Sequence, residues 1–329
     1  IVGWPFARLE LAKGDAAWGP AADDNLGLSA NAPSFPMVRL RSDFGPFRFT
    51  SLHGDLRPCP SRPDSPACCG TADSAASYIV NGTWRTIERR KHVAAHRLEV
   101  AVSPWLDVGL QEVVVYGDRG VELAYTIPVM FLWAAQSYLG DQDNLTMGLD
   151  LDLHPGRGLR LYAAYLADDM KKLAILSDDF ANKFSGQPGL LLVDPVGLRD
   201  TAVRVEYVRI EPWVYTHKYP INTYSHYDMP LGHALGPNSD RWSTRCEWRP
   251  ADGLELTGFA RRTRHGDNLV LADGTVVNVG GDLHLGYRAQ DERDRKEFLA
   301  GVVGKRLEFG LTGRWWPLPS SVWTWRTAR

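Results

Sequence analysis

The feature that most constrains this chain is a period-2 alternation of apolar and polar residues that recurs along most of its length. In the run 145–154, leucines and one methionine alternate with Thr, Gly, Asp and His, and a second alternating run covers 159–168. A strand places successive side chains on opposite faces, so each run has one apolar and one polar face. The turn Pro-Gly-Arg-Gly at 155–158 separates the two runs. Together they predict a β-hairpin.

The same unit recurs elsewhere, and the connections between strands follow a strict order. Short links lie near residues 43, 103, 155, 197 and 251. They alternate with long connections at 13–36, 54–91, 117–144, 168–189, 214–240 and 263–297. Soluble domains rarely hold many structureless links of more than about 15 residues. Outer-membrane barrels, in contrast, have short periplasmic turns and long external loops in this order.

Composition excludes two other classes of protein. The longest apolar stretch, 127–135, contains a proline and is well short of the roughly 18 residues that a spanning helix needs. The formal net charge is only -2. This balance gives no electrostatic footprint for nucleic acid, so we expect no nucleic-acid partner.

The polar faces pair opposite charges two residues apart, which suits a crowded, partly hydrated lumen. We therefore expect these residues to face lipid: Leu149, Leu151, Leu161, Val203, Val205 and Leu256. We expect these to face the lumen: Asp150, Asp152, Arg160, Arg204, Glu206 and Glu255. Aromatic residues at strand tips predict an interfacial girdle. They are Trp105, Tyr116, Trp213, Trp242, Trp248, Trp315 and Trp316.

These patterns predict an all-β fold, a transmembrane antiparallel outer-membrane β-barrel with long extracellular loops, as a single domain over 1–329. Such barrels have an even number of strands, here about 14 or more if complete, whereas the sequence yields about thirteen. Either a hairpin is merged within 263–297, or the chain is truncated at Ile1 or Arg329. A short helix is expected only around 129–138, in a loop or in the lumen.

Three of the four cysteines cluster in a Pro- and Ser-rich stretch. We expect a disulfide from Cys59 to Cys68 or Cys69, with Cys246 unpaired on the lipid-facing side. A free or structural thiol is the second alternative. Zinc is the third, because the cluster lacks a nearby histidine and the usual paired spacing.

No residue pattern indicates an enzyme, and no cofactor or metal site is predicted. The start Ile1-Val2-Gly3 is typical of activated trypsin-like proteases, but the chain has no Gly-Asp-Ser-Gly stretch for the nucleophile. Asp150, Asp152 and His154 share one polar face, yet no Ser, Cys or third group completes a site there. Inward-facing charges are ordinary in a barrel lumen.

The densest cluster of aromatic and histidine residues lies between 213 and 228. Aromatic rings stack on sugar rings, and histidines supply directional hydrogen bonds. These residues predict a polysaccharide-binding surface at the external mouth: Trp213, Tyr215, His217, Tyr224, His226 and Tyr227. Loop packing together with the girdle is the alternative interpretation of the same cluster.

Several short motifs resemble the capsule-assembly Wzi-type family over roughly Trp18 to Trp316. They are Trp18-Gly19-Pro20, the runs 25–33 (NLGLSANAP) and 44–49 (FGPFRF), His96-Arg97-Leu98-Glu99, Pro230-Leu231-Gly232-His233, and the run 235–240 (LGPNSD). The resemblance implies an outer-membrane barrel of a Gram-negative-type bacterium that holds capsular or related surface polysaccharide without chemistry. It also implies contact with outer-membrane lipid and lipopolysaccharide. The family's barrels are typically larger than this chain.

Two functions from different classes follow. The first is a non-enzymatic anchor for surface polysaccharide, and the second is a porin-like channel for small solutes. Occlusion discriminates between them, because a lumen filled by 18–36 and the helix 129–138 would block solute flux, whereas an open lumen would conduct.

Overall fold

The computed structural model describes residues 1–4, 6–59, 75–169, 177–291 and 294–316. Thirteen strands form one large antiparallel sheet. In sheet order they are β1 (Val2–Trp4), β2 (Ala7–Gly14), β3 (Phe35–Phe44), β4 (Phe47–Leu56), β7 (Lys91–Ser103), β8 (Leu106–Gly117), β9 (Asn144–Gly156), β10 (Leu159–Asp169), β11 (Lys183–Val193), β12 (Thr201–Ile210), β15 (Ser239–Ala251), β16 (Leu254–Asp267) and β19 (Val302–Trp315).

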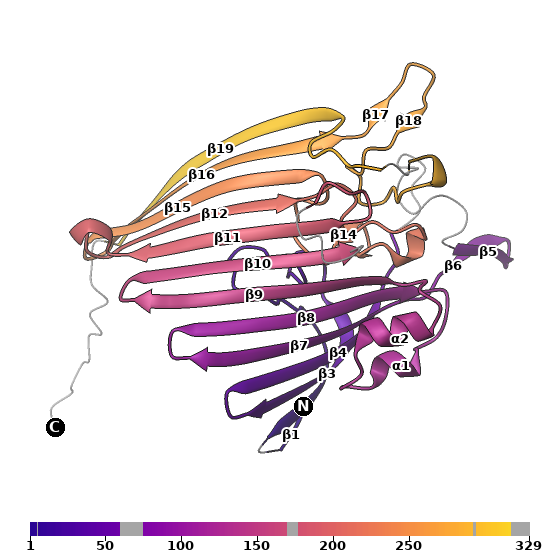
Figure 1. Cartoon of the computed structure of the whole chain (residues 1–329), viewed down its shortest axis with the longest axis horizontal. Helices are drawn as coiled ribbons and strands as arrows, with labels where there is room; N and C mark the ends of the chain where they lie inside the picture. The colour runs from indigo at the N-terminus through magenta and orange to yellow at the C-terminus, as the bar shows by residue number, and fades with distance from the viewer. Residues whose placement is uncertain (5, 60–74, 170–176, 292–293, 317–329) are drawn as a thin grey trace, which may run out of the picture.

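Small elements occupy the long connections at one end of the sheet (Figure 1). They are the hairpins β5 (Ala75–Val80) with β6 (Thr83–Glu88), β13 (Ser225–His226) with β14 (Met229–Pro230), and β17 (Leu269–Val270) with β18 (Val276–Val277), and the helices α1 (Leu123–Thr126) and α2 (Leu132–Tyr138). Single 3-10 turns lie at Pro195–Gly197, Pro220–Asn222 and Ala289–Asp291. The predicted alternation of short turns and long loops is confirmed.

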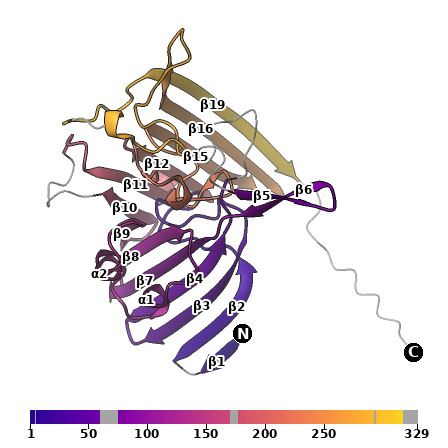
Figure 2. The same ribbon diagram turned by 90° about the vertical axis from the view of Figure 1, so that its right-hand side faces the viewer.

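The sheet is curved, running from β1 along one edge to β19 along the other (Figure 2). Every pair of neighbouring strands is antiparallel, and each pairs with the strand next to it in the order above. Within the described residues, β1 and β19 do not pair with each other. The sheet is therefore the wall of a barrel that is open between these two strands. Among the described residues, no helix is long and apolar enough to cross a membrane.

The two faces of the wall are divided as the alternation predicts. Leu149 pairs with Leu110 of β8, and both side chains are more than a third exposed on the outer face. The next residue along β9, Asp150, is buried on the other face, where both its oxygens accept hydrogen bonds from Arg97 at 2.7 and 3.0 Å. A bidentate pair of this kind satisfies two charges that would be costly to bury alone. The polar side is thus the lumen side.

The lumen changes character along its length, which the alternation does not reveal. Towards the turn end it is lined by ion pairs such as Arg160 with Asp152. Towards the loop end the same face turns apolar, and inward residues of β4, β7, β8 and β12 form one buried cluster with residues from the connections. Its members include Leu52, Val93, Val113, Ile210, Leu26 and Tyr215. The main core of the molecule is therefore the interior of the barrel near its loop end.

Five of the seven aromatic residues predicted to form the girdle are exposed, as that prediction requires. The exposed members are Trp105, Trp242, Trp248, Trp315 and Trp316. Tyr116 and Trp213 are buried, so the prediction was wrong for these two. The ring of Tyr116 packs against Tyr125 of α1, with ring centroids 5.1 Å apart, and Trp213 packs against Phe180. Residue type and strand-end position cannot tell an interfacial ring from one covered by a loop.

Helix α2 lies where a helix was expected in the chain, and α1, at 123–126, was not expected. Buried residues of α1 and α2, including Tyr125 and Leu132, pack with Ala94 and Val114. Those two residues alternate with lumen-facing Val93 and Val113, so they belong to the outer face. The helix of 132–138 therefore covers the outside of the barrel near its loop end, so of the two expected places the loop is correct and the lumen is wrong.

Only part of the cysteine prediction falls on the residues that the structure describes. Cys246 has a free thiol and pairs in register with Val203, on the outer face as predicted. Cys59 is buried. Cys68 and Cys69 lie outside the described residues, so the disulfide from Cys59 to one of them stays a prediction.

Candidate functional site

A segment between β2 and β3, residues 15–34, lies inside the barrel and is called here the lumen plug. Polar side chains of the wall hold it from several strands. Arg160 of β10 donates to the carbonyl of Pro20 at 2.8 Å, and Gln187 of β11 donates to the carbonyl of Asp24 at 2.8 Å. From β16, Arg261 lies 3.5 Å from the Asp23 carboxylate. The plug is thus tied to the wall across the lumen.

A second segment, residues 211–238 between β12 and β15, folds over the plug and is called here the strap. Two buried tyrosines of the strap donate to plug carbonyls, Tyr215 to Leu26 at 2.6 Å and Tyr224 to Gly27 at 3.1 Å. The Ser29 backbone N–H donates to the Leu231 carbonyl at 2.7 Å. Buried backbone groups need such partners, since an unpaired one costs about as much as a lost hydrogen bond.

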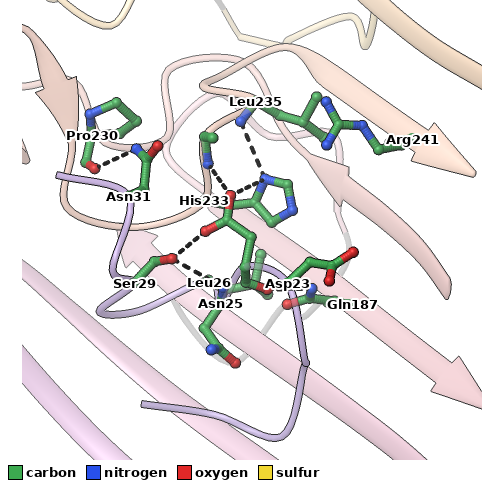
Figure 3. Close-up of polar contacts among 12 residues, drawn as sticks. Asp23, Asn25, Leu26, Ser29, Asn31, Gln187, Pro230, His233, Leu235 and Arg241 are labelled. Carbon is green, nitrogen blue, oxygen red and sulfur yellow. Dashed lines mark hydrogen bonds and ion pairs between the residues drawn. The ribbon is translucent and has the colours of Figure 1, made fainter. Parts of the chain in front are cut away.

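The centre of this contact is His233 of the strap (Figure 3), which lies beside Asp24 of the plug. The carboxylate of Asp24 accepts hydrogen bonds from the Ser29 hydroxyl and from the Ala234 N–H, the latter at 2.7 Å. It also lies 3.6 Å from Nδ1 of His233, and that nitrogen accepts the Leu235 N–H at 3.2 Å. Burial lowers the pKa of His233 to about 4, so the imidazole is neutral at pH 7.

Gly232 allows the strap and plug to approach this closely, and Gly27 lets the plug approach the side chain of Gln111 on the wall. A Cβ at Gly232 would lie 2.4 Å from the Leu26 carbonyl oxygen and 2.5 Å from the Tyr215 hydroxyl. A Cβ at Gly27 would meet the Gln111 side chain at 2.2 Å. Only glycine fits where two backbones come this close. The motifs NLGLSANAP and PLGH of the sequence therefore meet in space as the two sides of one contact.

The residues predicted to bind polysaccharide differ in their exposure in this arrangement. Trp213, Tyr215, Tyr224 and His226 are buried. Tyr215 stacks on Tyr224, with ring centroids 5.3 Å apart and planes 14° apart. Their ring faces are covered by protein, so these four hold the strap in place and are not at a surface. Only His217 and Tyr227 keep exposed area, and Tyr227 is 39% exposed.

The backbone of the strap is held in an unusual conformation at two of these aromatics. Trp213 has φ of 73° and Tyr215 has φ of 70°, in the left-handed region that bulky residues seldom adopt. Such residues persist there only when the surroundings fix them. Trp213 is fixed by a backbone hydrogen bond to Gly280 at 3.0 Å and by ring contacts with Phe180 and Tyr287. The strap is therefore a rigid element.

At the external end of the barrel, the strap borders an open cavity of about 430 Å³, called here the rim pocket. Its walls come from the strap, the end of β16 and the connection that follows β18. The polar side chains that line it are Asp228, His265, Asp267, Asn268, Asp282 and His284. Sequence reasoning missed these residues, because they are spread over more than fifty positions and only the fold brings them together. Tyr227 precedes Asp228 in the chain and is not one of the residues that line the pocket.

The polar trio Asp150, Asp152 and His154 does not form a reactive site. Asp150 is paired with Arg97, and Asp152 with Arg160. His154 lies 3.3 Å from Asp152 near the turn end of the wall. In the described ranges, no group of three or more His, Cys, Asp or Glu residues could hold a metal ion.

Comparison with known proteins identifies a family that matches this chain. Residues 2–292 match the model of the family described as "Capsule assembly protein Wzi". No protein with a curated description matches the sequence.

Among solved structures, one similar protein is Wzi of Escherichia coli, described as an outer-membrane protein involved in group 1 capsule assembly and a carbohydrate-binding β-barrel. The identity is 14%, the TM-score is 0.54, and the match covers 80% of this chain. The chain spans 55% of that protein's length.

Two outer-membrane proteins are more weakly similar. The channel DcaP of Acinetobacter baumannii has a TM-score of 0.44 at 9% identity, covering 94% of this chain and 70% of its own. OprD of Pseudomonas aeruginosa has a TM-score of 0.39 at 13% identity, covering 91% and 64%. Likeness at this level adds nothing to the assignment of the fold.

Proposed function

Because this chain belongs to the capsule assembly protein Wzi family, we propose that it binds surface polysaccharide without chemistry at the outer membrane of a Gram-negative bacterium. The observation that carries the proposal is the rim pocket, which opens on the external side of a lumen closed by the plug and the strap. A plugged barrel with an accessible external pocket suits retention of a ligand better than passage of one. The porin-like alternative requires an open lumen.

The rim pocket suits a hydroxyl-rich ligand. Its carboxylates accept hydrogen bonds only, and each carboxylate offers about four acceptor sites. Asp282 uses one oxygen for the His284 N–H at 2.9 Å, and Asp267 lies 2.9 Å from Nε2 of His265. The remaining acceptor sites match sugar hydroxyls. Tyr227, which precedes the lining residue Asp228 in the chain, is 39% exposed, and an exposed ring of this kind can stack on a sugar.

The proposal is tested with the purified full chain and fluorescently labelled surface polysaccharide from the same bacterium. We expect saturable binding by the parent protein. Tyr227→Ala and Asp282→Asn should each weaken it by about fivefold, since a stacked ring or a charged hydrogen bond contributes about 1 kcal/mol. The double variant should be weaker than either.

Tyr138→Ala serves as the matched control, because Tyr138 is an exposed tyrosine on α2, away from the rim pocket. It should bind like the parent. Heat-modifiable migration of every variant checks that the barrel is assembled. Binding by the double variant at the parent's affinity would place the polysaccharide site elsewhere on the molecule.

A further inference from the structure

A second cavity lies on the outer face of the wall, beneath the connection that carries α1 and α2. It has a volume of about 300 Å³ and is called here the ledge cavity. The wall contributes Leu98, Leu110 and Met147, and residues 128–131 of the connection form its roof. Since a water-sized unit occupies about 30 Å³ of liquid, the cavity holds on the order of ten such units. A single flexible chain fits this space.

The floor of the cavity carries one polar group without a partner. Both carboxylate oxygens of Glu112 accept the Leu132 N–H at the start of α2, each at 2.9 Å. The Nδ1–H of His96 donates to the same carboxylate at 3.2 Å, which fixes the imidazole. Its other nitrogen, Nε2, makes no hydrogen bond in the described structure, although His96 is only 5% exposed. A buried polar atom is costly to leave unpaired, so this nitrogen points to a ligand atom that would pair with it.

The ledge cavity is continuous with the surface that faces lipid. Leu110 and Met147 line it and are 47% and 37% exposed, and Leu149 continues the same outward row towards the turn end. Val129 at its roof is 85% exposed. In an outer-membrane barrel this row contacts acyl chains. A chain from the surrounding leaflet can enter the cavity without crossing water.

We propose that the ledge cavity is a binding site for one acyl chain of an outer-membrane lipid, and that Nε2 of His96 accepts a hydrogen bond from a hydroxyl or amide group on that lipid. With Nδ1–H given to Glu112, Nε2 is the acceptor in the tautomer that carries a single ring proton. A lipid whose acyl chains bear hydroxyl or amide donors satisfies it. A diacyl lipid without such donors fills the volume and leaves the nitrogen unpaired.

Native mass spectrometry of the full chain in detergent tests this, with lipid A and dioleoylphosphatidylcholine as the two probes. Lipid A has amide and hydroxyl donors near its acyl chains, and phosphatidylcholine has none. We expect the parent to retain one lipid A at least fivefold more than phosphatidylcholine. His96→Phe should remove this preference. Met147→Trp should fill the cavity and reduce lipid A retention at least fivefold.

Leu149→Trp is the matched control, because Leu149 lies on the same row but outside the cavity. It should retain lipid A like the parent. Val129→Trp changes the exposed roof of the cavity and takes the place of Met147→Trp in the test if Met147→Trp does not assemble. Equal retention of lipid A by the parent, Met147→Trp and Val129→Trp would overturn the proposal. So would a parent dimer that Met147→Trp dissociates, because a second copy would then occupy this face.

Discussion

Two histidines of the strap make contacts that only a neutral imidazole can make. Nδ1 of His233 accepts the Leu235 N–H, and Nδ1 of His226 accepts the Arg57 N–H at 2.8 Å. Burial, together with nearby positive charge at His226, lowers the pKa of each histidine to about 4. Protonation at Nδ1 would replace an acceptor with a donor that faces another donor.

Acidification should therefore loosen the strap. The folded pKa lies below the unfolded value of about 6.5, so the stabilisation is fully present above pH 6.5 and is lost as the pH falls towards 4. Lowering the pKa from 6.5 to about 4 corresponds to about 3 kcal/mol for each histidine. Chemical denaturation at pH 7 and at pH 4.5 measures this loss as a decrease in the free energy of unfolding. Replacing both histidines with Asn, which keeps an acceptor that does not titrate, should reduce this pH dependence, and an unchanged pH dependence would contradict the assignment.

At this same scale, the sequence predicts which face of the sheet a side chain points to better than it predicts whether a loop buries that side chain. Alternation correctly separated Leu149 from Asp150, because a strand turns each residue to the opposite face. It could not show that Trp213 and Tyr224 would be buried under the strap. Their burial depends on loops that return from distant positions, and no local pattern records that return.

Between elements, the contact of plug and strap depends on the space at Gly232. Gly232→Ala would force the strap away from the Leu26 carbonyl and the Tyr215 hydroxyl, which a Cβ would approach to 2.4 and 2.5 Å. Overpacking of this kind typically costs about 1–3 kcal/mol. We expect a lower midpoint of denaturation and faster proteolysis within 15–34.

The control for that prediction is Gly186→Ala. A Cβ at Gly186 meets nothing within 4 Å, and this residue lies within β11. The variant should behave like the parent. Equal stability of Gly232→Ala and the parent would show that the strap does not rest on the plug as described.

The elements themselves were predictable to different degrees. Strands with strict alternation, such as β9 and β10, appear where expected, since each has a complete apolar face. The side of the wall covered by α2 was not predictable. The polar Glu112 among the outward apolar residues of β8 was the available signal, because a carboxylate there needs a donor such as the Leu132 N–H.

For the molecule as a whole, the central claim is that the space inside the wall is filled by the chain's own plug and strap, and that the ligand binds at the external rim. The plug is bound to the wall by side chains of β10, β11 and β16 and covered by the strap. Family membership and the wall of long strands were readable from motifs and alternation. The closed lumen was not, because it depends on contacts between residues some 200 positions apart, such as Tyr215 with Leu26.

Planar-bilayer conductance of the purified full chain tests this claim most directly. A variant in which a short Gly-Ser linker replaces the lumen plug, residues 15–34, is measured beside it, with heat-modifiable migration as the check on assembly. The parent should show no steady conductance steps, and the plug-deleted variant should show them. Steady open-channel steps from the parent protein would contradict a closed lumen and favour the porin-like channel.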